Sequence, residues 1–173
     1  MSGKYVFDAA LVLGNGIPCT TALPPPAPGH LTLRIPDGLS LQSLRDGAVG
    51  RKYIHGQYWY DEYGWSKAAL PAGTYLLRIP VPGSNRKTAP EQAALLGAGT
   101  PFAPVALLAA ALLCCMLHGG PDTIGRGTVR CYERSALGDH VVLTRLGWRL
   151  GVFVYPDGGH GGSVWASSVR KLS

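Results

Sequence analysis

The chain has 173 residues, of which 46% are hydrophobic and 15% are charged, and its net charge is +6. This balance excludes an intrinsically disordered protein and predicts a single domain, 1–173, with a substantial core. The charge is uneven, because residues 126–173 hold seven basic and three acidic groups. A nucleic acid or an acidic protein is therefore a candidate partner, although a basic surface without such a partner fits the same numbers.

The first part of the chain predicts short strands, a proline-rich crossing and one capped helix. Strands are expected over 5–13 and 31–35, each followed by a turn that contains glycine. The prolines of 20–29 remove backbone donors, so this stretch is expected to cross the surface as polyproline II. A helix over 40–48 can be capped by Ser40.

The segment 73–118 predicts the centre of the fold. A strand begins at Gly73, a sharp turn follows at 83–88, and a short helix is expected over 89–96. The next helix, 103–118, is apolar all round, which is typical of a helix buried in a core. It is shorter than the roughly 20 residues that a membrane span needs. The side chains expected to be buried are Leu107, Leu108, Ala111, Leu112 and Cys115.

The remainder of the chain predicts strands in an antiparallel meander. Their expected ranges are 128–134, 140–146, 148–155 and 163–170. Combined with the apolar helix, they predict an α+β fold in which a mainly antiparallel sheet packs against the 103–118 helix.

One run of residues resembles a small family of uncharacterised bacterial proteins. It reads Leu70-Pro-Ala-Gly-Thr-Tyr-Leu-Leu-Arg-Ile-Pro-Val-Pro-Gly-Ser-Asn-Arg-Lys-Thr88 and is followed by Glu91-Gln92 and Ala103-Pro104-Val105. The resemblance extends from about Tyr58 to the C-terminus. It implies a bacterial cytoplasmic origin and brings no activity, catalytic residue or ligand with it.

Cysteine and histidine spacing gives no catalytic or metal motif. The cysteines, Cys19, Cys114, Cys115 and Cys131, have neither CxxC nor zinc-ligand spacing, so buried, reduced thiols in the cytoplasm are expected. No histidine pair has HxxxH or HExxH spacing, and no serine lies in a GxSxG motif. Hence no metal, cofactor or catalytic residue is predicted.

The turn at 83–88 is the first candidate site, because it follows a strand and opens a helix. The free N–H groups at a helix N-terminus suit a phosphate or carboxylate. The candidate anion-binding residues are Ser84, Asn85, Arg86, Lys87 and Thr88. An ordinary capped turn with solvated basic residues is the alternative, since the Walker spacing is absent.

The segment 53–65 is the second candidate, because it concentrates aromatic residues. Asp61 and Glu62 would point to opposite faces of a strand, which is poor geometry for an acid/base pair. An aromatic patch for a protein partner is predicted from Tyr58, Trp59, Tyr60, Tyr63 and Trp65. Packing of these rings over a sheet edge is the alternative.

One face of the C-terminal sheet is the third candidate, for a nucleic acid or a protein partner. Strand alternation is expected to combine arginines with aromatic rings, as on surfaces that stack bases and hold phosphates. The residues are Arg130, Tyr132, Arg134, Arg149, Phe153, Tyr155 and Trp165. In the alternative, the rings pack under a helix and the arginine stems extend to solvent.

These patterns favour a non-enzymatic binding module. It would contact a protein partner or nucleic acid through its basic C-terminal half. A small enzyme, with a dispersed active site near the 83–88 turn and the 53–65 segment, is the alternative class. No membrane association is expected.

Overall fold

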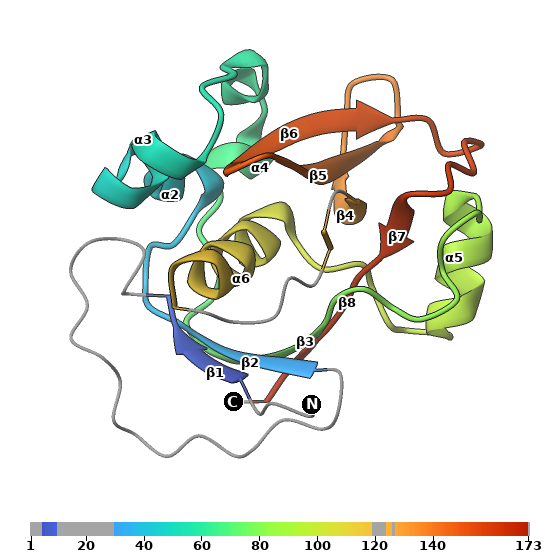
Figure 1. The fold of residues 1–173 in the computed structure, drawn as a ribbon, viewed down its shortest axis with the longest axis horizontal. Coiled ribbons are helices and arrows are strands. Elements are labelled where there is room, and N and C mark those ends of the chain that lie inside the picture. The colour runs from blue at the N-terminus through green and yellow to red at the C-terminus, as the bar shows by residue number, and fades with distance from the viewer. Residues whose placement is uncertain (1–4, 10–29, 119–123, 126, 173) are drawn as a thin grey trace.

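The computed structural model describes residues 5–9, 30–118, 124–125 and 127–172 (Figure 1). Two predicted features, the end of the first strand and the polyproline crossing, lie outside these residues, as does Cys19. The elements are β1 (Tyr5–Asp8), β2 (His30–Ile35), α2 (Leu41–Asp46), α3 (Ala48–Tyr53), η1 (Trp59–Glu62), α4 (Gly64–Lys67), β3 (Gly73–Arg78), α5 (Ala89–Leu96), α6 (Val105–His118), β4 (Thr128–Arg134), β5 (His140–Leu146), β6 (Arg149–Tyr155), β7 (Val164–Ala166) and β8 (Ser168–Lys171).

The strands form two four-stranded sheets, ordered β1-β2-β3-β8 and β6-β5-β4-β7. Each sheet is mainly antiparallel and carries one parallel pair, β1 with β2 and β4 with β7. The predicted α+β class is confirmed. Where the sequence predicted one sheet, the structure has two.

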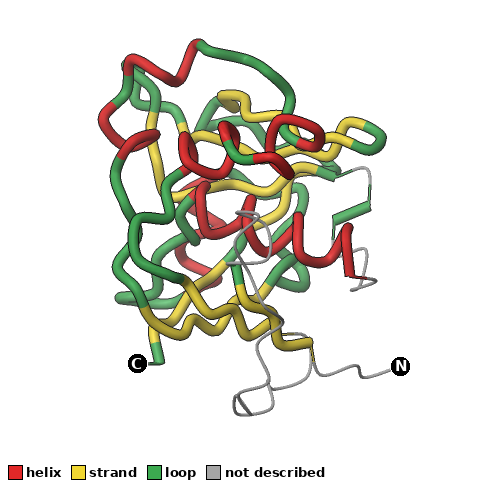
Figure 2. Tube along the Cα trace, turned by 90° about the vertical axis from the view of Figure 1, so that its left-hand side faces the viewer, coloured by secondary structure: helices red, strands yellow, loops and turns green. Residues whose placement is uncertain are grey.

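Helix α6 lies between the two sheets, as Figures 1 and 2 show from two directions. It contacts β4 and β5 of one sheet and β1 of the other. This placement explains why the helix is apolar on every side. The five side chains predicted to be buried, Leu107, Leu108, Ala111, Leu112 and Cys115, are all buried. Within the described part of the chain, no helix has the length and apolar character needed to cross a membrane.

The expected fourth strand of the meander is divided at Ser167, which corrects the prediction for 163–170. β7 pairs with β4, whereas β8 leaves that sheet and pairs with β3. The buried Ser167 hydroxyl donates to the carbonyl of Arg130 at 3.0 Å and accepts from the N–H of Ala103 at 3.1 Å. These two bonds satisfy backbone groups at the point where the chain changes sheets.

Local signals define the short helices. Ser40 caps α2 as predicted, and Ser43 completes a capping box. Thr88 and Glu91 form the same device at α5. Gly50 of α3 packs so closely on α2 that an added Cβ would lie 1.7 Å from the carbonyl oxygen of Leu44, and only glycine fits there.

Candidate functional site

A pocket of about 540 Å³ lies between α5 and β4. We call it the α5–β4 pocket. Its lining residues are Trp65, Ala89, Pro90, Ala93, Leu96, Thr100, Pro101, Phe102, Tyr132, Glu133, Arg134, His140 and Asp157. Most of the wall is apolar or aromatic, and the charged groups come from β4, β5 and the loop after β6. The pocket thus has the composition usual for a ligand site, with a few polar groups in an apolar wall.

Helix α5 is anchored by hydrogen bonds. The side-chain N–H groups of the buried Gln92 donate to the carbonyls of Ser84 and Val164, at 2.8 and 3.1 Å. The N–H of Ala89 donates to the carbonyl of Asp157 at 2.8 Å. The helix therefore forms a fixed wall opposite β4.

Three charged or titratable groups form a closed network at the polar end of the pocket. Arg134 donates to Asp157 from Nη1 at 2.7 Å, and its Nη2 lies 2.9 Å from Nε2 of His140. Nδ1 of His140 lies 2.7 Å from the carbonyl of Cys131. A carbonyl can only accept a hydrogen bond and a guanidinium can only donate one. Nδ1 therefore carries the proton, and Nε2 accepts. Burial lowers the pKa of His140, which keeps the ring neutral.

Glu133 is the remaining charged group in the wall. Its Oε2 accepts a hydrogen bond from the N–H of Val105, 2.8 Å away, at the first residue of α6. Burial nevertheless raises the pKa of this carboxyl group to about 7. Oε2 is therefore used by the helix, and the backbone N–H of Glu133 itself is a further hydrogen-bond donor to the carboxyl group.

A second pocket of about 540 Å³ adjoins the first. It is lined by Gly99, Thr100, Pro101, Phe102, Pro104, Tyr132 and Val169, so the two pockets share Thr100, Pro101, Phe102 and Tyr132. The side chain of Tyr132 is 61% exposed. An extended apolar surface therefore runs along both sides of this ring.

The predicted anion-binding turn is engaged within the protein. The buried Ser84 hydroxyl donates to the carbonyl of Val81 and accepts from the N–H of Ala166. Thr88 caps α5, and the Glu91 carboxylate accepts from the Thr88 N–H at 2.7 Å. This carboxylate already occupies the helix N-terminus that an anion would use.

The rest of that turn contacts the glycine-rich loop 156–162. The Asn85 side chain donates to the carbonyl of Gly162 at 3.4 Å. The backbone N–H of Arg86 donates to the carbonyl of Gly161 at 3.3 Å. Arg86 is exposed and has a positive φ of 58°. Lys87 is half-buried.

Arg130 lies beneath the same loop and is 0% exposed. Its guanidinium is 5.5 Å from the ring centroid of Tyr155, and Nη2 donates weakly to the carbonyl of Gly159 at 3.4 Å. Nε and Nη1 have no hydrogen-bond partner within the described residues. Burial lowers the pKa of this group. Its position is therefore that of an enclosed cation.

The strand register assigns the predicted C-terminal residues to different places. Arg130, Phe153 and Arg149 share one face, because Arg130 pairs with Val142, which pairs with Phe153. Tyr155 lies on this face too. Trp165 pairs with Val129, the neighbour of Arg130, and so belongs to the opposite face. A register shift lies between Arg130 and Arg134, and Tyr132 and Arg134 line the α5–β4 pocket.

The segment 53–65 runs from the last residue of α3 through η1 into α4, so Asp61 and Glu62 lie in a helical turn and not on a strand. Trp59 is the centre of a ring cluster and makes edge-on contacts with Tyr60, Tyr63 and Trp65. The distances between ring centroids are 5.6 to 6.2 Å. Tyr60 is fully buried, whereas Tyr58 is 67% exposed and lies under the guanidinium of Arg45.

Trp65 connects this cluster to the pocket. Its indole N–H donates to the carbonyl of Arg134 at 3.2 Å, and its ring lines the pocket with Tyr132. The structure thus combines members of two candidate sets that are far apart in sequence. Sequence reasoning missed Phe102, Glu133, His140 and Asp157, which come from four separate segments. No local pattern in the sequence distinguishes these four residues.

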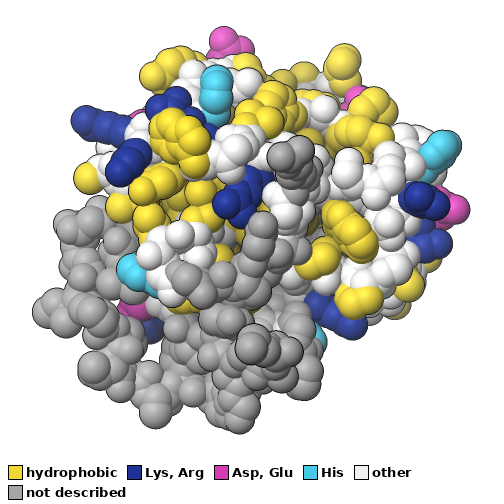
Figure 3. All heavy atoms as spheres, viewed as in Figure 1, with side chains coloured by type: hydrophobic (Ala, Val, Ile, Leu, Met, Phe, Trp, Pro, Cys, Tyr) yellow, Lys and Arg dark blue, Asp and Glu magenta, His cyan; other side chains and the backbone are white. Residues whose placement is uncertain are grey.

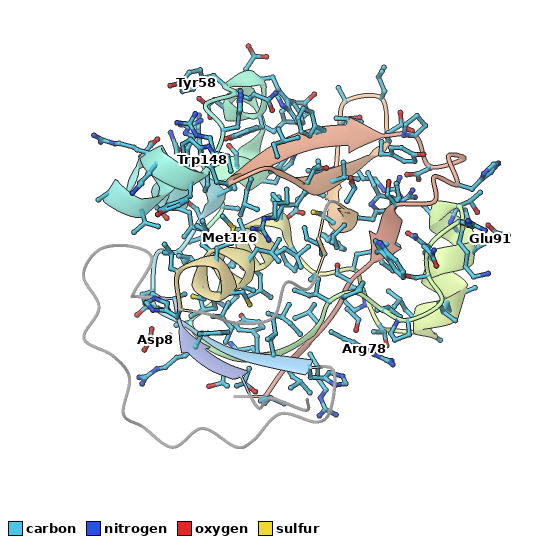
Figure 4. All side chains as sticks on the ribbon, viewed as in Figure 1. Asp8, Tyr58, Arg78, Glu91, Met116 and Trp148 are labelled. Carbon is cyan, nitrogen blue, oxygen red and sulfur yellow. The ribbon has the colours of Figure 1, made fainter. Side chains whose placement is uncertain are left out.

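A basic aromatic surface lies at the far end of β6. Trp148 is 55% exposed, and the guanidinium of Arg149 lies 4.4 Å from the centroid of its ring. Tyr53 meets the same indole edge-on, and Lys52 lies over Tyr53. Figure 3 shows basic side chains around an apolar patch at upper left, and Figure 4 places Trp148 there, across the molecule from Glu91 on α5.

The described residues contain no group of three or more His, Cys, Asp or Glu side chains that could hold a metal ion. Comparisons with protein-family models, with curated proteins and with solved structures found no match.

Proposed function

We propose that this protein is a non-enzymatic binding module that holds a segment of a protein partner in the α5–β4 pocket. The observation that carries the proposal is the continuity of two pockets along Tyr132. Because the two pockets share Thr100, Pro101, Phe102 and Tyr132, they form one surface, and exposed aromatic rings in apolar hollows are typical anchors of protein interfaces. This surface belongs to the C-terminal half of the chain, where the sequence predicts the partner-binding region.

The test is selection from a library of displayed random peptides on the wild-type protein. The enriched peptides are then measured on Ala93→Trp, which places an indole in the pocket, and on Ala94→Trp. Ala93 and Ala94 are both exposed on α5, but only Ala93 lines the pocket. Binding is expected to weaken at least about tenfold in Ala93→Trp and to persist in Ala94→Trp. Equal binding by both variants, or no enrichment, contradicts the proposal.

A second candidate function is weak binding of single-stranded nucleic acid at Trp148. It is favoured by the exposed indole with Arg149 beside it, an arrangement suited to one stacked base and one phosphate. Arg130 is enclosed and Arg134 is paired with Asp157, so Arg149 is the arginine of the predicted set to test. Oligonucleotide affinity should fall in Trp148→Ala, and Arg149→Gln should reduce the salt slope by about 0.7. Absence of binding by the wild type at low salt excludes this function.

The enzyme class is less well supported. The α5–β4 pocket has a carboxyl group with a pKa of about 7, but both ring nitrogens of His140 are engaged. Its described lining contains no serine, cysteine or lysine to act as a nucleophile. Trp65 lines this pocket, whereas no residue of the 83–88 turn does.

A reducing, cytoplasmic location belongs to the same proposal. It is supported by the buried thiols of Cys114, Cys115 and Cys131, which form no disulfide within the described residues.

A further inference from the structure

The charges that face the α5–β4 pocket do not cancel. The positive charge of Arg134 is met by Asp157 at 2.7 Å, and His140 is neutral because its Nε2 accepts from Arg134. The lining residues from α4 and α5 are uncharged. Glu133 is consequently the one lining group whose charge, once present, has no countercharge among the described residues of the wall.

The same wall is rich in aromatic rings. Trp65, Phe102 and Tyr132 come from three different segments and line one pocket with Glu133. The faces of such rings attract cations, most strongly when the cation is partly removed from water. Pro101, Ala93 and Leu96 supply apolar surface for an alkyl chain. The wall therefore suits a cation at the end of an aliphatic stem.

We infer that the α5–β4 pocket takes a lysine side chain of the protein partner, with its stem against the apolar wall and its ammonium group between the aromatic rings and the carboxyl group of Glu133. This inference rests on the proposed function and specifies the residue that the partner contributes. Lysine fits better than arginine, because a compact ammonium can meet one carboxylate oxygen, whereas a guanidinium prefers two. One of the two oxygens of Glu133, Oε2, is held by the Val105 N–H.

Binding of an ammonium group should be coupled to the protonation of Glu133. A cation beside this carboxyl group favours its ionised form, so binding lowers a pKa that burial holds at about 7. The other titratable groups facing the pocket are Tyr132 and Arg134 on β4, His140 on β5 and Asp157 after β6. Of these, His140 is already neutral and Asp157 is already ionised, since the hydrogen bond from Arg134 outweighs burial and holds the pKa of Asp157 low. Affinity should therefore rise between about pH 6 and about pH 8, with release of up to one proton.

The experiment compares two blocked amino acids, N-acetyl-lysine methylamide and N-acetyl-norleucine methylamide, by NMR shifts of the pocket amides. The two probes share the aliphatic stem, and only lysine carries the ammonium. At about pH 8 the wild type should bind lysine at least about tenfold more tightly. Glu133→Gln, which keeps an acceptor for Val105, should reduce the preference to about twofold or less and abolish its pH dependence. Glu62→Gln removes an exposed acid on η1 and should change neither property.

Tyr132→Ala is a second variant on an exposed side chain, so it tests the ring contribution without a folding risk. It should weaken lysine binding more than norleucine binding. Equal binding of the two probes by the wild type, no shift with either probe, or a preference that survives Glu133→Gln overturns the inference. The peptide selection distinguishes this failure from that of the proposed function. Peptides that need an open Ala93 surface but contain no lysine would leave the binding module standing and contradict the lysine assignment.

Discussion

The guanidinium of Arg130 lies over the ring of Tyr155, with 5.5 Å between its central carbon and the ring centroid. Its Nε and Nη1 atoms have no hydrogen-bond partner within the described residues. Arg45 is buried too, but it donates to the carboxylates of Asp46 and Asp61. Among the described residues, Arg45 is thus a buried arginine that is ion-paired, and Arg130 is one held mainly by an aromatic ring.

These two arginines should respond to the same substitution in opposite ways. Arg130→Met removes a buried charge and fills its volume with an apolar chain, so the free energy of unfolding should stay unchanged or rise by about 1 kcal/mol. Arg45→Met leaves two carboxylates without their partner and should lower it by about 2 kcal/mol. Urea unfolding of both variants provides the measurement. A large loss in Arg130→Met would show that a group of opposite charge compensates Arg130 in solution.

Glu133 should make stability depend on pH in a defined direction. Its pKa is about 7 in the folded protein and near 4.5 as an isolated group, so the folded state binds more protons between these values. The free energy of unfolding contributed by this group is therefore highest below about pH 4.5 and is lost as the pH rises through 7. Relative to Glu133→Gln, the wild type should lose up to about 3 kcal/mol between about pH 4 and about pH 8.

The comparison with Glu133→Gln isolates this one group. The pKa of His140 is lowered by burial, which gives the opposite slope below 6.5, but that slope is common to both proteins. Thermal or urea unfolding across the pH range provides the measurement. A difference between the two proteins that does not vary with pH would contradict the assignment.

Ser167 should contribute more to stability than its neighbour. Ser167→Ala leaves the buried N–H of Ala103 and carbonyl of Arg130 without their shared partner, at a cost of about 1–3 kcal/mol. The adjacent Ser168 is half-buried, and Ser168→Ala should stay within about 0.5 kcal/mol. Chemical unfolding of the two variants compares them directly, and equal losses would argue against a special role for Ser167.

The core helix should be sensitive to cavity formation. Leu112 is buried in α6, and Leu112→Ala should lower the free energy of unfolding by about 2–5 kcal/mol. Leu137, in the loop between β4 and β5, is 90% exposed, and Leu137→Ala serves as the matched control. This control should lower the free energy of unfolding by about 0.5 kcal/mol or less. A folded, monomeric Leu112→Asp variant would show that the helix is not in the core.

Local patterns in the sequence predicted much of the fold. The helix 89–96 coincides with α5, and 103–118 contains α6, because a capping box and an unbroken apolar run act within a few residues. The strands 128–134 and 140–146 agree with β4 and β5, because the residue pattern of a strand is also a local signal. The existence of two sheets could not be predicted, since strand alternation gives no information on which strands pair.

The candidate site was predictable only in part. Trp65 was predicted in the aromatic patch, and Tyr132 and Arg134 were predicted on the C-terminal sheet; their meeting depends on how α4 packs beside β4. Charge alone did not reveal that Arg130 is enclosed, because burial of that side chain depends on a loop nearly thirty residues later. Glu133 had no distinguishing local pattern, and its role follows from the position of Val105.

The division of the last strand at Ser167 has a consequence for amide hydrogen exchange. Residues of β7 are bonded to one sheet and those of β8 to the other, with one residue between them. An opening fluctuation that frees β7 from β4 therefore pulls directly on the pairing of β8 with β3. We expect the protected amides of the two sheets to exchange with a common opening free energy, as one cooperative unit.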